Sequence, residues 1–122
     1  MNRFTLTTSQ KGKRGENIAA TALTEAGYVI VDRNWRCTTG ELDLIARHHN
    51  DIVFVEVRTR IAGAGAALES ITPRKAEKLT ALAYQYLAEH NLEDSAFRID
   101  IAAVSFKAGK ATVEIVENAV GW

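Results

Sequence analysis

The stretch from residue 40 to residue 60, GELDLIARHHNDIVFVEVRTR, decides the fold of this 122-residue chain. In residues 41–47 and 52–58 the side chains divide between two faces with the two-residue period of a β-strand, and the second run is rich in β-branched residues. One face is purely apolar, and the other is apolar near the turn and charged at the far end. The polar residues 48–51 between them form a connection of a common hairpin length. The stretch therefore predicts an antiparallel hairpin.

The hairpin brings acidic residues together at its open end. If the loop closes symmetrically about residues 48 and 51, Asp43 faces Glu56 and Glu41 faces Arg58. Opposed β-carbons in an antiparallel pair lie roughly 4.5 to 5.5 Å apart. Two carboxylates at that distance repel each other unless a cation or a proton lies between them. The open end therefore predicts a site for Mg²⁺ or Mn²⁺, since both prefer carboxylate oxygens.

The same alternation assigns the faces of the two strands. Leu42, Leu44 and Ala46 share a purely apolar face of the first strand. Arg58 shares a face with Glu56, so its charge can reach a phosphate held by a metal ion. Carboxylates, a divalent metal ion and a phosphate-binding cation together indicate a metal-dependent nuclease.

Asp43, followed thirteen residues later by the triplet Glu56, Val57 and Arg58, resembles the PD-(D/E)xK signature of restriction-endonuclease-like nucleases. More closely, nearly the whole chain is similar to the YraN family of small bacterial proteins, which resembles Holliday-junction resolvases of that fold. The segments that carry this resemblance are KGKRGENIAATAL, GYVIVDRNWRCTTGELDLIA, VFVEVRTR, FRIDIAAV and the closing NAV.

The resemblance implies one α/β domain over residues 1–122 with a restriction-endonuclease-like fold, a mixed β-sheet flanked by helices in the order α-β-β-β-α-β-β. It also implies hydrolysis of phosphodiester bonds in DNA, including branched or junction DNA, with Mg²⁺ or Mn²⁺ as cofactor. Related nucleases carry a metal-assisting glutamate on the first helix and a cation on the helix after the second motif strand. The expected metal ligands are Asp43, Glu56 and Glu16, and the expected catalytic set adds Arg58 and Lys75.

Arg58 is the departure from the signature, which has lysine there. Arginine keeps the positive charge, but it is effectively never deprotonated and cannot act as a base. A non-catalytic nucleic-acid-binding module of nuclease fold therefore stays open as an alternative, and so does a protein-interaction scaffold. For Glu16, a favourable acid at a helix N-terminus is the alternative to a metal-assisting role.

The rest of the chain predicts the elements around the hairpin. A mobile lead-in is expected over residues 1–8, then a helix from about residue 9 to residue 26, a short strand at 28–31 and a flexible loop at 61–71. Thr72 and Pro73 begin a second helix that ends near His90, and two more strands follow at 97–106 and 111–116 around a Lys-Ala-Gly-Lys turn.

Charge and composition limit the choice of partners. The net charge is zero, so any contact with nucleic acid depends on local cations, and the candidates are Lys13, Arg14, Arg36 and Arg60. The chain has one cysteine and no apolar run long enough for a signal peptide or a membrane span, so we expect a cytoplasmic protein without membrane contact. A homodimer stays open.

Three further polar residues are not assigned to the site. Asp100 is expected to pair with a nearby arginine. His48 and His49 are expected to be solvated at the hairpin turn, and no zinc is expected there.

Overall fold

The structure is a computed structural model in which residues 8–120 are described, the first four of them for their backbone only. The elements are α1 (Thr8–Glu25), β1 (Val29–Cys37), β2 (Gly40–His48), β3 (Asp51–Thr59), α2 (Ala64–Glu69), α3 (Pro73–Glu89), β4 (Phe97–Lys107) and β5 (Lys110–Val116). The expected lead-in lies outside the described residues, apart from Thr8, which belongs to α1. Within the described residues, no helix is long and apolar enough to cross a membrane.

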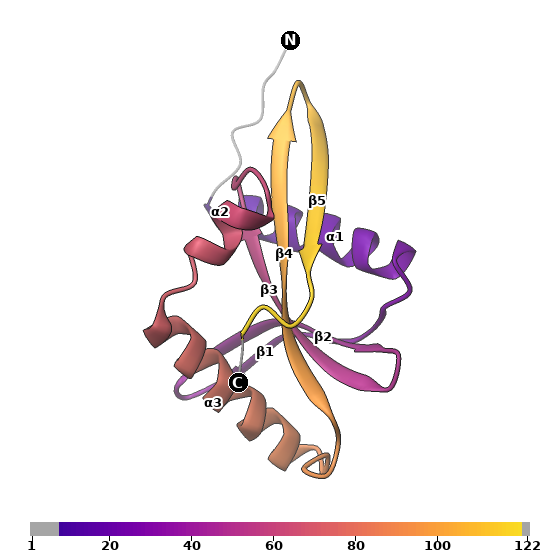
Figure 1. Cartoon of the computed structure of the whole chain (residues 1–122), viewed down its shortest axis with the longest axis vertical. Coiled ribbons are helices and arrows are strands. Elements are labelled where there is room, and N and C mark those ends of the chain that lie inside the picture. Colours follow the sequence, from indigo (N-terminus) through magenta and orange to yellow (C-terminus); the bar gives the residue numbers. More distant parts are fainter. Residues whose placement is uncertain (1–7, 121–122) are drawn as a thin grey trace.

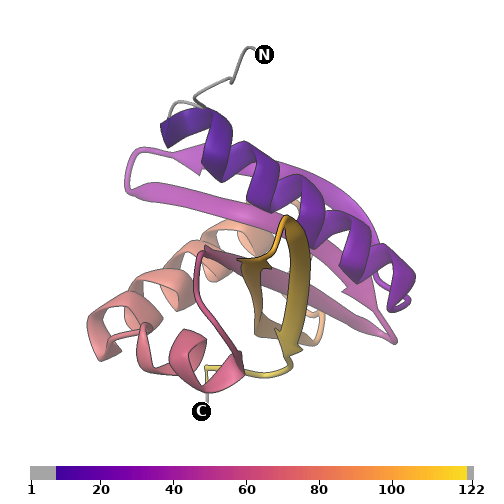
Figure 2. The same ribbon diagram turned by 90° about the horizontal axis from the view of Figure 1, so that it is seen from above.

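One mixed sheet runs through the centre of the molecule in the order β1-β2-β3-β4-β5. Neighbouring strands are antiparallel except β3 and β4, which are parallel and are connected by the crossover through α2 and α3. Helices α1 and α3 lie on opposite sides of this sheet (Figures 1 and 2). The molecule is therefore a three-layer α/β domain.

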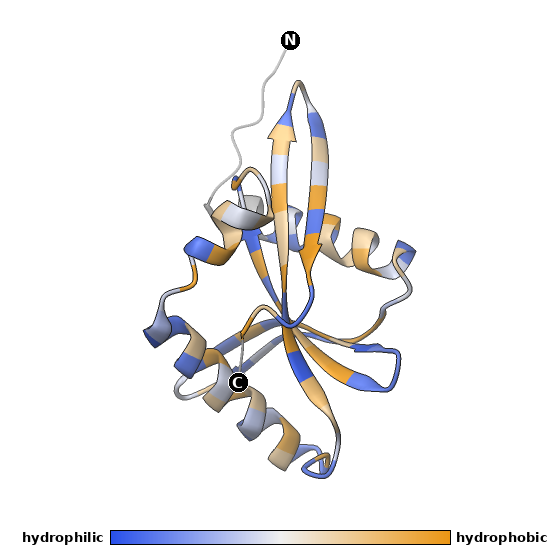
Figure 3. Ribbon diagram, in the orientation of Figure 1, coloured by the Kyte–Doolittle hydropathy of each residue, from blue (hydrophilic) through white to orange (hydrophobic). Residues whose placement is uncertain are grey.

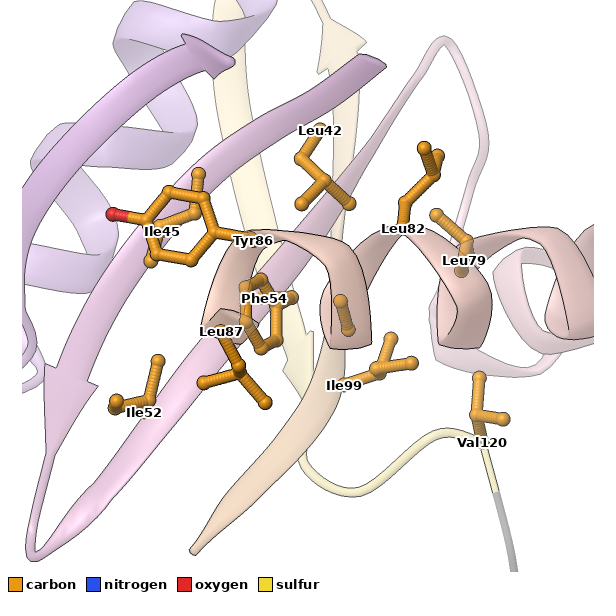
Figure 4. Packing of buried hydrophobic residues seen from close by; sticks show 11 residues of the cluster. Leu42, Ile45, Ile52, Phe54, Leu79, Leu82, Tyr86, Leu87, Ile99 and Val120 are labelled. Carbon is orange, nitrogen blue, oxygen red and sulfur yellow. The ribbon is translucent and has the colours of Figure 1, made fainter. Parts of the chain in front are cut away.

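Helix α3 covers one face of the sheet because its apolar residues recur with helical spacing. Leu79, Leu82, Ala83, Tyr86 and Leu87 are buried against the apolar side chains of β2, β3 and β4, as Figure 4 shows. The Thr72 side chain accepts a hydrogen bond from the Lys75 N–H, and Pro73 begins the helix, as predicted. Figure 3 shows long hydrophobic stretches, in orange, along the central strands of the sheet.

The predicted register of the central hairpin is confirmed. Leu44 pairs with Val55, and the pairing continues to His48 and Asp51 at the turn. The ladder between β2 and β3 ends at Leu44 and Val55, so the acidic end lies just beyond it. There Glu41 pairs with Arg36 of β1 instead of facing Arg58.

The predicted apolar face of β2 is partly wrong. Leu44 and Ala46 belong to the core cluster beneath α1, but Leu42 packs in the cluster beneath α3 together with Ile45. Leu42 and Leu44 still pair with Trp35 and Arg33 of β1, but Asn34 between these two partners has a positive φ of 51°. The side chains of β2 change faces at this irregularity, between Leu42 and Leu44.

Two other predicted elements differ from the structure. The expected flexible loop at 61–71 contains α2, because Ala67 is buried against Ile101 and Ala103 of β4. Strand β1 extends well past the predicted residue 31, through a polar segment. It is an edge strand, where polar side chains face solvent and hide the apolar alternation.

A buried polar network closes the end of the sheet near the β2–β3 turn. Asp100 is fully buried and accepts hydrogen bonds from the Tyr28 hydroxyl at 2.7 Å, the Arg98 Nε at 3.0 Å and the Asn118 N–H at 2.9 Å. The expected pairing of Asp100 with an arginine is confirmed. The expected solvation of His48 is wrong, because its ring is buried and stacks on Tyr28 at 3.9 Å.

Gly15 lets α1 approach the end of β3. A β-carbon added at Gly15 would lie 2.0 Å from the Cγ2 atom of Thr59, a distance that real contacts do not allow. We expect Gly15→Ala to reduce the free energy of unfolding by about 1 to 3 kcal/mol, the usual cost of overpacking. Urea unfolding measures this loss. The additional change Thr59→Ala should recover most of it, and an equal loss in the double variant would contradict the contact.

Candidate functional site

The site begins where β2 separates from β3. Asp43 stands at that point, and its Oδ2 atom accepts a hydrogen bond of 2.9 Å from the backbone N–H of Val57. A side-chain carboxylate thus bonds the backbone of β3 just past the last ladder pair of β2. This bond holds the Asp43 carboxylate in the gap between the two strands.

Two further carboxylates reach the same gap. Glu16 comes from α1 and Glu41 from β2, and one oxygen of each lies within 4.8 Å of the others and of an oxygen of Asp43. All three side chains are partly buried. Glu16 lies more than two turns into α1, so the alternative of an acid at the helix N-terminus is wrong. Three convergent carboxylates could together hold a hard divalent cation, because such ions prefer carboxylate oxygens.

Burial and neighbouring carboxylates in the gap raise the pKa values of Asp43 and Glu16. Burial, followed by the hydrogen bond with Glu56 and the charge of Glu56, raises the pKa of Asp43 to about 8, although the Val57 N–H opposes this. Burial and then the charge of Glu41 raise the pKa of Glu16, although Asn34 and two cations oppose this. The raised pKa of Asp43 favours a bound proton or a cation over a free negative charge on this carboxylate.

Glu56 lies beside these carboxylates but is paired with cations. It is 8% exposed, and its Oε2 atom lies 3.1 Å from the Lys75 Nζ and 3.9 Å from an Arg58 guanidinium nitrogen. Lys75 projects from α3, on the opposite side of the sheet from Glu16. The Arg58 Nε atom is buried without a hydrogen-bond partner among the described residues.

The four cations predicted to contact nucleic acid lie in two different places. Arg36 forms an ion pair of 2.7 Å with Glu41 and so borders the carboxylate group directly. Lys13, Arg14 and Arg60 are exposed, and the Arg14 guanidinium lies over the Phe106 ring at 5.0 Å. These three lie on the side of the site where α1 meets the end of β3.

Two residues that shape the site were not among the predicted ligands. The sequence placed Glu41 at the acidic open end of the hairpin but not in the metal set, and the structure brings its carboxylate to those of Glu16 and Asp43. Asn34 of β1 has a positive φ of 51°. With its amide nitrogen toward Glu16, it lies 2.9 and 3.1 Å from the two carboxylate oxygens. Only the paired strands bring Asn34 to this position, so no sequence pattern marks it.

The raised pKa of Asp43 predicts a pH dependence of stability in metal-free protein. Its folded pKa is about 8 against an ordinary 3.8, so the folded state holds a proton that the unfolded state has lost. The free energy of unfolding should therefore fall as pH rises from about 4 to about 8, with a slope of about 1.4 kcal/mol per pH unit from this group. Urea unfolding across this range should show a shallower slope for Asp43→Asn. The exposed Asp94→Asn is the matched control, and an unchanged slope in Asp43→Asn would contradict the assignment.

Comparison with known proteins supports the fold and shows the family. The family model described as "Uncharacterised protein family UPF0102" matches residues 15–104. A UPF0102 protein of Chloroflexus aurantiacus is 49% identical over 100 residues, which cover 81% of this chain and 82% of that protein. A UPF0102 protein of Roseiflexus castenholzii is 45% identical over 113 residues, which cover 89% of this chain and 91% of that protein.

A solved complex of EndoMS with double-stranded DNA is similar in structure, with a TM-score of 0.51 and 18% sequence identity. The match covers 89% of this chain but only 41% of the solved chain. The predicted restriction-endonuclease-like fold is therefore confirmed, with its five-stranded mixed sheet between helices. The match of the family model to most of the chain and the close relatives show that this protein belongs to the family UPF0102.

Proposed function

We propose that this protein is a metal-dependent nuclease that hydrolyses phosphodiester bonds of DNA, with branched or junction DNA as its substrate. One observation carries the proposal: carboxylate oxygens of Glu16, Glu41 and Asp43 converge within 4.8 Å of one another beside the Glu56–Lys75 pair. Carboxylates held this close in a partly buried gap repel one another unless a cation neutralises them.

The donor set fits Mg²⁺ or Mn²⁺. Asp43 would be the central ligand, because it borders both Glu16 with Glu41 and the Glu56 side chain. Only carboxylate oxygens are offered, and these suit hard divalent ions better than zinc. Mg²⁺ or Mn²⁺ bound there would supply Lewis-acid stabilisation of negative charge on the phosphate and activation of water.

The chain's own cations would hold the substrate. Arg58, whose side chain is 28% exposed, would donate its terminal N–H groups to a phosphate oxygen. Lys75, from α3, would supply the amine that the nuclease signature places where Arg58 stands, since it reaches Glu56 at 3.1 Å. Lys13, Arg14, Arg36 and Arg60 would contact the DNA backbone around the site. Two copies of the chain would be needed to cut a symmetric junction in both strands.

A second candidate function is a nucleic-acid-binding module of nuclease fold without catalysis. The observation that favours it is Arg58 in the position of the signature lysine, because a guanidinium cannot take a proton from water. This candidate predicts DNA binding that is sensitive to salt, independent of metal and not followed by cleavage.

Variants of the two cations distinguish these candidates. Lys75→Ala should reduce cleavage of labelled DNA by about 100-fold or more, within the 10²- to 10⁴-fold range of a lost proton-transfer group. Arg58→Lys should keep or increase cleavage, since it restores the signature. Gel assays with branched, duplex and single-stranded DNA in Mg²⁺, Mn²⁺ or EDTA measure both. Arg47→Ala, an exposed change at the other end of β2, is the control. Equal cleavage by Lys75→Ala and wild type would remove Lys75 from the mechanism.

A further inference from the structure

Beyond the site, the β4–β5 hairpin projects as an arm that no strand of the central sheet accompanies. Strand β3 pairs with β4 only as far as Thr59 and Val104, but the ladder between β4 and β5 continues to Lys107 and Lys110. Residues 105–112, called the wing here, therefore form a two-stranded ribbon that extends past the sheet (Figure 1). At 3.4 Å per residue the three pairs of the wing reach roughly 10 Å.

The tip of the wing concentrates positive charge. Ala108 and Gly109 have φ values of 50° and 77°, and two positive φ values fit the tight type I′ turn that closes a two-residue hairpin loop. This turn sets Lys107 directly opposite Lys110, and both are exposed. Like charges in directly opposed positions destabilise a hairpin. A bound polyanion would offset this repulsion, because both lysines would then lie beside its negative charges.

Two cations from neighbouring segments lie beside the aromatic ring of Phe106 at the base of the wing. The Arg14 guanidinium lies over the Phe106 ring, and Arg60 shares with Phe106 and Ser105 a pocket of about 190 Å³. Arg60 has a positive φ of 61°, an uncommon conformation for a residue with a side chain. Its backbone thus turns at the end of β3, where the chain leaves the sheet beside the wing.

In the part of the chain that the structure describes, these cations are not held in ion pairs, although Arg14 lies over the Phe106 ring. Among the described residues, no acidic group lies within ion-pair distance of Arg14, Arg60, Lys107 or Lys110. By contrast, Arg36, Lys75 and Arg98 each pair with a carboxylate. Cations that form no ion pair within the protein can neutralise phosphates without first breaking such a pair.

The wing lies next to the carboxylate group. Gly15 touches Thr59 at the end of β3, and its neighbours in α1 are Arg14, over Phe106, and Glu16, in the carboxylate group. A nucleic-acid strand that passes the carboxylates at this end of α1 therefore meets the base of the wing. One nucleic-acid strand carries a phosphate about every 3.4 Å, so the length of the wing equals the span of about three phosphates.

We propose that the wing is a phosphate-backbone clamp that binds the DNA flanking the cleaved bond, with Lys107 and Lys110 at its tip and Arg14 and Arg60 at its base. This inference rests on the proposed function for the identity of the ligand as DNA. It adds a contact surface outside the catalytic groups and assigns Lys107 and Lys110 a role.

The test is the affinity of Lys107→Ala/Lys110→Ala for labelled branched and duplex DNA, measured by fluorescence anisotropy in EDTA over a series of salt concentrations. Each lost phosphate contact reduces the slope of log K against log salt by about 0.9, so the slope should fall by about 2 and binding should weaken by about 10-fold at low salt. Lys107→Arg/Lys110→Arg keeps the charge and should bind like the wild type. Arg47→Ala controls for a lost charge at the other end of β2. Thermal unfolding checks that each variant is folded.

The outcomes separate this inference from the proposed function. Equal affinity and salt slope for the alanine variant and the wild type would overturn the proposed role of the wing, even if the wild type cleaves DNA. DNA binding by the wild type that depends on both lysines but is never followed by cleavage with Mn²⁺ would support the wing and overturn the nuclease proposal. Wild-type protein that binds no DNA at low salt would overturn the wing.

Discussion

Asp43→Asn is expected to abolish Mn²⁺ binding and to reduce DNA cleavage by more than about 100-fold, because even an outer partner of a metal ligand costs 10- to 100-fold. The Asp43 carboxylate borders every other carboxylate of the site, and asparagine of similar shape offers one neutral oxygen. Calorimetric titration of Mn²⁺ measures binding, and single-turnover assays measure cleavage. Binding should also release protons, because the raised pKa of Asp43 favours its protonated form and a metal ion displaces that proton.

Matched variants show which carboxylates share the ion with Asp43. Glu41→Gln tests the group that includes Glu16, and Glu56→Gln tests the ligand expected from the motif. The exposed Asp94→Asn is the control and should bind Mn²⁺ like the wild type. Tight Mn²⁺ binding by Asp43→Asn would contradict the assignment of the site.

Arg98→Met is expected to reduce the free energy of unfolding by about 3 to 5 kcal/mol, the cost of removing one partner of a buried ion pair. Arg98 is 12% exposed and bonds both the fully buried Asp100 at 3.0 Å and Asp51 at 2.8 Å. Without it, Asp100 keeps the Tyr28 hydroxyl and the Asn118 N–H but loses its counter-charge. Urea unfolding at neutral pH measures the change.

The double variant Arg98→Met/Asp100→Asn should be more stable than Arg98→Met, because the buried charge is removed together with its partner. Arg33→Met is the matched control. Its guanidinium bonds only the exposed Asn17 among the described residues, at 2.7 Å, so the loss should stay within about 1 kcal/mol. Equal losses for Arg33→Met and Arg98→Met would contradict the importance of the buried network.

The sequence predicted the elements whose start, end or register depends on interactions between residues close together in the chain. The polar residues between two β-branched or alternating runs specify the β2–β3 hairpin and its register, since a one-residue slip would turn every apolar side chain to the wrong face. Thr72 and Pro73 fit the start of α3 because one accepts a hydrogen bond and the other lacks an N–H to satisfy. Such signals involve neighbours in the sequence.

Tertiary contacts decided what could not be predicted. Helix α2 exists because Ala67 packs on β4, and Leu42 changes face beside the irregular Asn34 of β1. The turn beside His48 looked solvated, but Tyr28 and Arg98 cover it. In the site, the proximity of Asp43 and Glu56 followed from the hairpin, whereas the approach of Glu16 depended on how α1 lies across the sheet.

The most direct test of the central claim is cleavage of labelled branched and duplex DNA by wild-type protein in Mn²⁺, beside EDTA and beside Asp43→Asn in Mn²⁺. We predict cleavage that appears only with the metal ion and is lost in Asp43→Asn. Absence of cleavage by the wild type on every DNA, or equal cleavage by Asp43→Asn, would contradict the claim that the converging carboxylates form a nuclease site.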